Sequence, residues 1–152
     1  MYNRLNDIFR NIKRRCYNPN NKQFKDYGGR GVKLCKEWAD SEMVNLGKRG
    51  RVSKGWLAFQ EWSLNNGYSD NLTIDRIDNN KDYSPANCRW VSRKIQQNNK
   101  RNNRYITYRG KKQTLAQWCE ELQLNYSTTY YRLSVMNLSV EEAFNLPLRT
   151  SL

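Results

Sequence analysis

The sequence contains no histidine. Histidine is the side chain whose charge changes nearest to neutral pH, and it is therefore the commonest general base and a frequent zinc ligand. Its absence excludes the usual histidine-dependent forms of acid–base catalysis. A proton-transfer step in this chain would have to use a tyrosine, a metal-bound hydroxide or the substrate itself.

Long apolar runs are also missing. No stretch is apolar enough over about 20 residues to cross a bilayer. The N-terminus leads directly into an amphipathic segment and does not resemble a signal peptide. We therefore expect a cytoplasmic protein without a membrane partner.

Cysteine is scarce, and its four copies are widely spaced and form no CxxC pair. A cytosolic protein would keep such thiols reduced, and the simplest interpretation is that they are small buried side chains. A structural Zn²⁺ site shared by Cys16, Cys35 and Cys88 is the alternative. Because structural zinc takes four ligands and no histidine is available, the fourth ligand would have to be unusual.

Acidic residues are few: 14 Asp and Glu stand against 27 Lys and Arg, which gives a formal net charge of +13. The charge is uneven, because residues 1–104 hold 22 basic and 10 acidic side chains (net +12), whereas residues 105–152 hold 5 and 4 (net +1). A solvated basic surface is the plainest interpretation. Interleaved aromatic and asparagine side chains favour nucleic acid as the partner, since a disordered basic tail would lack them.

A chain of 152 residues is long enough for one or two small domains. Its changes in charge and composition predict an α+β protein with two parts. The first is an N-terminal domain at residues 1–100, and a basic linker at 101–104 joins it to a smaller C-terminal domain at 105–152.

In the N-terminal domain, apolar residues at three- and four-residue steps predict a helix over residues 3–15. The sequence YGGRG at residues 27–31 lacks the pattern and the following helix of a P-loop. We expect it to form a tight turn that presents Arg30 to a phosphate backbone. A short strand is predicted at 32–35 and a helix at 56–65.

The most informative segment comes next. Residues 72–77 alternate as a half-buried strand does, and residues 79–82 are typical of a turn. Residues 86–91 are expected to run back beside this strand in an extended conformation, and a short helix follows at 92–100. A strand, a returning extended segment and a helix in this order predict a ββα unit.

In the C-terminal domain, residues 105–114 predict a small hairpin, and Thr114 can cap the helix that follows. Ser127 is expected to cap a second helix at 127–134, and a capping pattern at residues 139–142 opens a third. Two short helices across a tight turn, followed by a third, are similar to a helix-turn-helix unit. The alternative is a small helical docking module, with which the net charge of +1 is compatible.

The sequence DRIDNNKDYSPANCRW, which starts at Asp75, resembles the HNH, or ββα-metal, endonucleases when it is taken together with YGGRG. The resemblance covers about residues 5–100 and is nearest to a histidine-poor subset common in phage genomes. Residues 105–148 resemble a module often appended to such phage proteins. A restriction endonuclease of the same class also has Asp-Arg where most relatives have Asp-His, which implies that this pair is compatible with cutting.

The resemblance implies a DNA endonuclease or nickase with Mg²⁺ or Mn²⁺ as cofactor. Its substrate would be double-stranded DNA, in the host cell cytoplasm if a phage encodes it. A hard cation needs oxygen ligands, and Asp75 can supply a carboxylate at the end of its strand. Gln96, Gln97 or Asn98 on the facing helix would supply an amide oxygen. Arg76 stays protonated and cannot be a base, so we expect it to clamp the scissile phosphate.

Other residues of the segment receive supporting roles. Tyr83 or Tyr27 is the candidate general base. The resemblance implies that Asn87 ties the two sides of the loop together and orients the catalytic residue. Asp78 is expected to cap the turn that follows it.

The contacts to DNA are expected from basic and polar side chains in both domains: Arg30, Lys94, Lys100, Arg101, Arg104, Ser127, Thr128, Tyr130, Tyr131 and Arg132. Two other functions remain open. One is a catalytically inactive HNH-derived protein that only binds DNA, or that inhibits a host nuclease or defence complex, and the lack of histidine favours it. The other is a protein-interaction module with an incidental basic surface.

Overall fold

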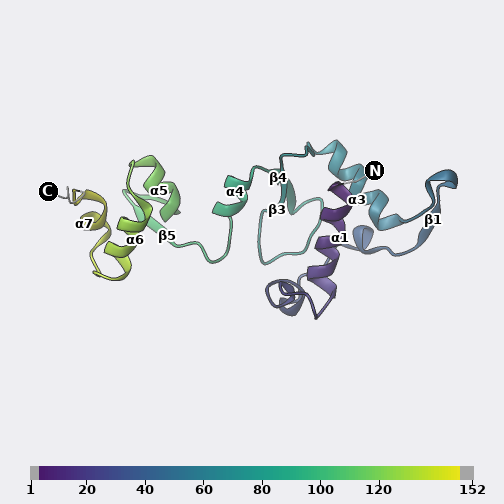
Figure 1. The fold of residues 1–152 in the computed structure, drawn as a ribbon, viewed down its shortest axis with the longest axis horizontal. Coiled ribbons are helices and arrows are strands. Elements are labelled where there is room, and N and C mark those ends of the chain that lie inside the picture. The colour runs from purple at the N-terminus through teal and green to yellow at the C-terminus, as the bar shows by residue number, and fades with distance from the viewer. Residues whose placement is uncertain (1–3, 148–152) are drawn as a thin grey trace. The chain divides into compact units, whose positions relative to one another are not determined.

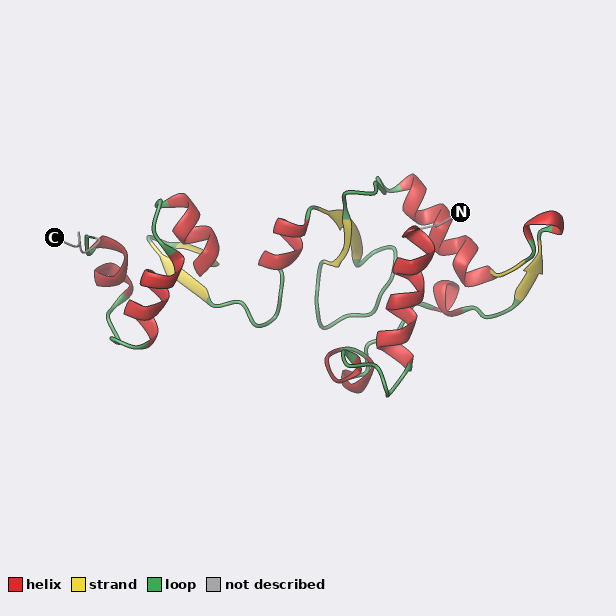
Figure 2. Cartoon of the chain, viewed as in Figure 1, coloured by secondary structure: helices red, strands yellow, loops and turns green. Residues whose placement is uncertain are grey.

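The computed structural model describes residues 4–147, apart from the side chain of Arg49. The chain divides into two compact units, residues 1–99 (unit 1) and 100–152 (unit 2). Both units combine helices with two-stranded antiparallel sheets, so the chain belongs to the α+β class, as predicted (Figure 1, Figure 2). Each unit has its own hydrophobic core.

Unit 1 begins with helix α1 (Arg4–Tyr17), which confirms the predicted N-terminal helix. Its buried face consists of apolar side chains at three- and four-residue steps: Leu5, Phe9, Ile12 and Cys16. This face packs against helix α3 (Lys54–Asn65), where Phe9 stacks on Phe59 with ring centroids 5.0 Å apart. The two helices and their aromatic side chains form the centre of the core of unit 1.

Two 3₁₀ turns follow α1, at Phe24–Asp26 and Gly28–Arg30. The second one lies against the end of α1. A Cβ atom at position 28 would lie 2.0 Å from the carbonyl oxygen of Cys16, so only glycine allows this close approach.

The strand predicted at residues 32–35 is not formed, and that prediction was wrong. Only an isolated parallel bridge joins Leu34 to Tyr83. Its hydrogen bonds run from the amide of Cys35 to the carbonyl of Tyr83 (2.8 Å) and from the amide of Tyr83 to the carbonyl of Lys33 (2.9 Å). Because the two segments meet at a single residue, no ladder develops. The bridge instead ties the glycine-rich turn to the loop after β3.

A short helix α2 (Lys36–Ala39) leads into a hairpin of strands β1 (Met43–Asn45) and β2 (Arg51–Ser53). Strand β2 runs directly into α3, and the side chain of Ser53 caps this helix by accepting a hydrogen bond from the amide of Trp56 (3.2 Å). The hairpin is therefore fixed to α3 at its second strand.

The predicted strand–return–helix order is confirmed by strands β3 (Thr73–Arg76) and β4 (Cys88–Val91) and helix α4 (Arg93–Asn98). The strands pair antiparallel, with Asp75 opposite Arg89. One residue, Ser92, separates the strand from α4, and its side chain caps the helix.

Unit 2 is a hairpin followed by three helices, and its elements are β5 (Tyr105–Tyr108), β6 (Lys111–Thr114), α5 (Leu115–Glu121), α6 (Tyr126–Ser134) and α7 (Val140–Asn145). The predicted caps at Thr114 and Ser139 are confirmed, and both form complete capping boxes. The predicted cap of the middle helix is wrong by two residues. Asn125 caps α6 by accepting from the amide of Thr128 (3.0 Å), and Ser127 lies inside the helix.

Within residues 4–147, no helix is both long enough and apolar enough to span a membrane.

Candidate functional site

Asp75 lies on strand β3 and is only 5% exposed. Its Oδ2 accepts hydrogen bonds from Nε and Nη2 of Arg89, both at 3.1 Å, across the strand pair. The guanidinium is partly exposed, whereas the carboxylate is buried. The carboxylate is therefore a buried charge that is compensated by an arginine at the surface.

Asn99, the residue directly after α4, completes the surroundings of this carboxylate. Its Nδ2 lies 3.1 Å from both Oδ1 and Oδ2 of Asp75 and donates to the carbonyl of Arg76 at 2.6 Å. Its own carbonyl accepts a hydrogen bond from the side chain of Asn79. Asn99 was not among the predicted site residues, although it belongs to the same run of amides.

Gln96, which was predicted as a metal ligand, holds the helix against the sheet. Its Nε2 donates to the carbonyl of Ile74 at 2.7 Å. The amide that hydrogen-bonds Asp75 is that of Asn99, one residue beyond the predicted ligand Asn98. The helix end thus supplies an amide to Asp75, but from a different position than predicted.

Arg76 was predicted to clamp a phosphate, but it is only 6% exposed. Its Nη1 donates to the carbonyl of Lys81 at 2.8 Å. Its guanidinium carbon lies 5.0 Å from the ring centroid of Tyr27 and 4.9 Å from that of Tyr83. Arg15 lies against the same two rings, at 4.8 and 5.4 Å. Arg76 is therefore part of a cluster of two arginines and two tyrosines, in which Arg76 and Tyr83 are buried and Arg15 and Tyr27 are partly buried.

Tyr83 is unsuited to act as a general base, which corrects its predicted role. It is 3% exposed, and burial raises its pKa far above the usual range, although Arg15 and Arg76 act in the opposite direction. Its hydroxyl stays protonated at neutral pH. Tyr27, the other candidate, is only partly buried, and its hydroxyl accepts a hydrogen bond from Nη1 of Arg15 (3.4 Å).

The loop between β3 and β4 is closed by Asn87. Its Oδ1 accepts from the amide of Asp78 (2.9 Å), and its Nδ2 donates to the carbonyls of Asp78 (3.0 Å) and Asp82 (2.9 Å). The loop-tying role predicted for Asn87 is therefore confirmed. Asp78 accepts from the amide of Asn80 (2.9 Å), which confirms its predicted place as the cap of the turn.

A hollow of about 470 Å³ lies on this loop and is lined by Asn80, Lys81, Asp82, Ser84, Ala86 and Asn87. Arg30 reaches the same loop from the glycine-rich turn, because its Nη2 donates to Oδ1 of Asn80 at 2.7 Å. Arg30 remains exposed, as its predicted contact with a phosphate backbone requires.

The other predicted DNA-contacting side chains of unit 1 and of the linker are exposed at the surface of their own units: Lys94, Lys100, Arg101 and Arg104. Arg104 also donates to the side chain of Ser134 (2.5 Å) and to the carbonyl of Leu133 (3.5 Å). These two bonds hold the start of unit 2 against the end of α6.

Helix α6 presents tyrosines at its surface. Tyr130 and Tyr131 are about half exposed, and Tyr130 stacks on Tyr126 with ring centroids 6.2 Å apart. Ser127 is exposed and Thr128 partly buried. These four of the predicted contacts (Ser127, Thr128, Tyr130 and Tyr131) remain accessible at least in part.

Arg132 differs from its predicted role as a DNA contact. It is 8% exposed, and its guanidinium donates to the carbonyls of Ala143 (3.1 Å), Leu146 (2.7 Å) and Pro147 (2.7 Å). These carbonyls lie at and beyond the end of α7, where helix geometry leaves them without backbone partners. Arg132 is thus committed to the interior of unit 2.

The cysteines proposed as zinc ligands are free thiols. Burial raises the pKa of Cys16 to about 11 and that of Cys88 to about 12, so both stay protonated at neutral pH, while Cys35 is only partly buried. Across the described part of the chain, no three His, Cys, Asp or Glu side chains are grouped so that they could hold a metal.

Comparison of the chain with models of protein families, with curated proteins and with solved structures finds no match in any of the three.

Proposed function

We propose that unit 1 is a DNA endonuclease or nickase of the HNH-like, ββα-metal type, and that unit 2 is a helix-turn-helix-like module that binds DNA. One observation carries the proposal: the carboxylate of Asp75 on strand β3 meets the amide of Asn99 at the end of α4. In the structure the side-chain nitrogen of Asn99 faces this carboxylate. If the amide oxygen faced the same side, the carboxylate and the amide would form a pair of oxygen donors for a hard cation.

The chemistry of these donors fits Mg²⁺ or Mn²⁺. Such cations are often held by one or two protein oxygens and fill their remaining positions with water and substrate phosphate. The nitrogen of Asn99 faces three acceptor oxygens, two of Asp75 and one of Arg76. A cation would have to replace these hydrogen bonds, and a half-turn of the side chain would then present its oxygen to the cation. Asp75 and Asn99 would then both be ligands. When bound, the cation would neutralise charge on the scissile phosphate and stabilise the leaving oxygen.

The remaining chemistry belongs to this chain's own side chains. Arg89 stays protonated and is partly exposed beside Asp75, so it can bind a phosphate oxygen of the DNA. Tyr27 is the tyrosine of the arginine–tyrosine cluster that solvent can reach in part, so its hydroxyl can hydrogen-bond the attacking water. A phosphate oxygen of the substrate can then accept the proton of that water. Arg76 acts as a positioning residue, because it supports Tyr27 from the face of its ring.

The test is the conversion of supercoiled plasmid in Mg²⁺, in Mn²⁺ and in EDTA. We expect nicked or linear product only with metal, and a loss of at least about a hundredfold in rate for Asp75→Asn and Asn99→Ala. Asp70→Asn is the matched control, because Asp70 is an exposed carboxylate of the same unit.

The two outcomes differ clearly. Cutting that persists in EDTA, or that survives Asp75→Asn while the fold is intact by circular dichroism, contradicts the proposal. Equal losses in Asp70→Asn and Asp75→Asn would contradict the assignment of the site.

A second function is favoured by the way Asp75 is already neutralised. Both its oxygens accept hydrogen bonds, one of them from the two nitrogens of Arg89, and Arg76 is buried rather than open to a phosphate. These features suit an HNH-derived protein that binds DNA without cutting it, or that inhibits a host nuclease or defence complex. Intact plasmid in every metal, together with a salt-sensitive gel shift, would identify this function.

A further inference from the structure

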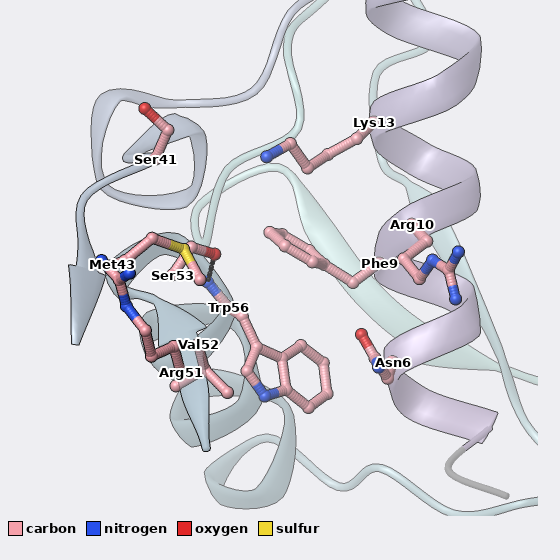
Figure 3. Close-up of a pocket in the computed structure, with 10 residues that line it drawn as sticks. All are labelled: Asn6, Phe9, Arg10, Lys13, Ser41, Met43, Arg51, Val52, Ser53 and Trp56. Carbon is pink, nitrogen blue, oxygen red and sulfur yellow. Dashed lines mark hydrogen bonds between the residues drawn. The ribbon is translucent and has the colours of Figure 1, made fainter. Parts of the chain in front are cut away.

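A second hollow in unit 1 does not involve the residues of the proposed nuclease site. It measures about 530 Å³ and lies between helix α1 and the β1–β2 hairpin with the first turn of α3 (Figure 3). This volume is within the range of pockets that take small organic ligands. Asn6, Phe9, Arg10 and Lys13 line it from α1.

The floor of this pocket is aromatic and apolar. The rings of Phe9 and Trp56 lie with centroids 5.8 Å apart and an interplanar angle of 49°. Phe9 is buried, whereas Trp56 is partly open, and Met43 and Val52 add apolar surface from the hairpin. Figure 3 shows the indole of Trp56 and the ring of Phe9 facing the space between α1 and the hairpin. A planar group could stack on such a floor.

The rim of the pocket is positively charged. Arg10 and Lys13 come from α1 and Arg51 from β2, so the lining has three cations and no carboxylate. Lys13 lies 5.7 Å from the centroid of the Phe9 ring. The carboxylate of Glu42, next to Met43 in the sequence, is paired with Lys54 at 2.7 Å. The field at the rim therefore favours an anion.

We propose that this pocket binds a nucleotide of single-stranded DNA. The base stacks against Trp56, and the phosphates on either side of it contact Arg10, Lys13 and Arg51. Aromatic floors with cationic rims are how proteins bind single strands without reading their sequence. DNA is the ligand here as in the proposed function, but this binding requires no cutting of the DNA.

The experiment measures the binding of a short fluorescein-labelled oligothymidylate to the full chain by anisotropy, in EDTA. One triple variant, Arg10→Gln with Lys13→Gln and Arg51→Gln, removes the rim. A matched triple, Lys22→Gln with Lys25→Gln and Lys36→Gln, removes the same charge from exposed positions elsewhere in unit 1. We expect the rim triple to weaken binding about tenfold more than the matched triple. Equal losses would mean that only the general field attracts DNA, and would overturn the proposal.

An abasic oligonucleotide of the same length tests the stacking. It has the same phosphates but no bases, so wild type should bind it about tenfold more weakly than oligothymidylate. Trp56→Leu should remove that difference, and Trp56→Phe should keep most of it. A difference that is the same in wild type and in Trp56→Leu contradicts the role of Trp56. The rim triple lies at the surface and tests the pocket independently if Trp56→Leu does not fold.

The two proposals fail separately. Asp75→Asn should bind the oligonucleotide as wild type does, because its side chain does not line the pocket. If the protein does not cut plasmid but its binding depends on the bases, the nuclease proposal is contradicted and the pocket proposal is supported. If it cuts plasmid but its binding does not depend on the bases, the pocket proposal is contradicted and the nuclease proposal is supported.

Discussion

A basic side chain on a predicted recognition helix looks like a contact for phosphate, and Arg132 is such a side chain. Its position in the sequence does not reveal that α7 ends beside it. The last carbonyls of a helix need donors, and a guanidinium with five N–H groups can satisfy several at once. Arg132 donates to one such carbonyl, that of Ala143, and to two just beyond the helix, those of Leu146 and Pro147. Arg132, which the sequence predicts as a DNA contact, therefore lies in the interior of unit 2.

Replacing Arg132 by methionine keeps much of the side-chain length but removes these donors. We expect Arg132→Met to lower the free energy of unfolding of unit 2 by about 2–4 kcal/mol, because buried carbonyls lose partners that carry a charge. Urea denaturation followed by the NMR signal of the indole N–H of Trp118, which lies in the core of unit 2, measures the change. Lys112→Met, at an exposed position, is the control. A similar stability for both variants would contradict the capping role.

Asn99 shows another limit of predicting the role of a single residue from the sequence. The run of amides from Gln96 onward made an amide beside Asp75 predictable, but not which one. Successive residues on a helix point about 100° apart, so an error of one residue in the helix end changes the side chain that meets Asp75. The structure ends α4 at Asn98, which lets Asn99 turn back toward the strand.

Elements with a strong local pattern were predicted well. Strand β3 follows from the alternation of its sequence, and the caps at Thr114 and Ser139 follow from capping chemistry. The segment at 32–35 was predicted wrongly as a strand. A strand needs a partner segment of several residues, and Leu34 pairs only with Tyr83. Ser127 and Asn125 are equally good cap residues, so the sequence alone did not decide between them.

The glycine-rich turn allows a test at the level of an element. A Cβ at Gly28 would meet the backbone of α1 at 2.0 Å, whereas one at Gly29 would meet the carbonyl of Phe24 at 3.2 Å. We expect Gly28→Ala to destabilise unit 1 by about 3 kcal/mol, because α1 or the turn must move. Gly29→Ala should cost clearly less. Thermal denaturation of the two variants beside wild type makes the comparison, and equal shifts would show that the turn adapts freely.

The molecule as a whole concentrates its charge in residues 1–104, with a net +12 there and +1 in the remainder. If the exposed basic residues after α4 bind phosphates, replacing them should lower the salt dependence of DNA binding. The variant combines Lys100→Gln, Arg101→Gln and Arg104→Gln. We expect the slope of log K against log salt to fall by about 1 for each phosphate that the variant no longer binds.

Titrations of labelled double-stranded DNA over a series of salt concentrations give this slope. The control carries the same charge change on the hairpin of unit 2, by Arg109→Gln, Lys111→Gln and Lys112→Gln. An unchanged slope in the first variant, or an equal fall in both, would remove the linker from the DNA-binding surface.

The bridge between Leu34 and Tyr83 also bears on how unit 1 folds. It joins segments that are 49 residues apart, as does the hydrogen bond from the amide of Lys33 to Asp82. Closing so long a loop costs chain entropy before any contact compensates for it. The β3–β4 hairpin and α1 can form from local contacts alone. The arginine–tyrosine cluster should therefore be among the last parts of unit 1 to assemble during refolding.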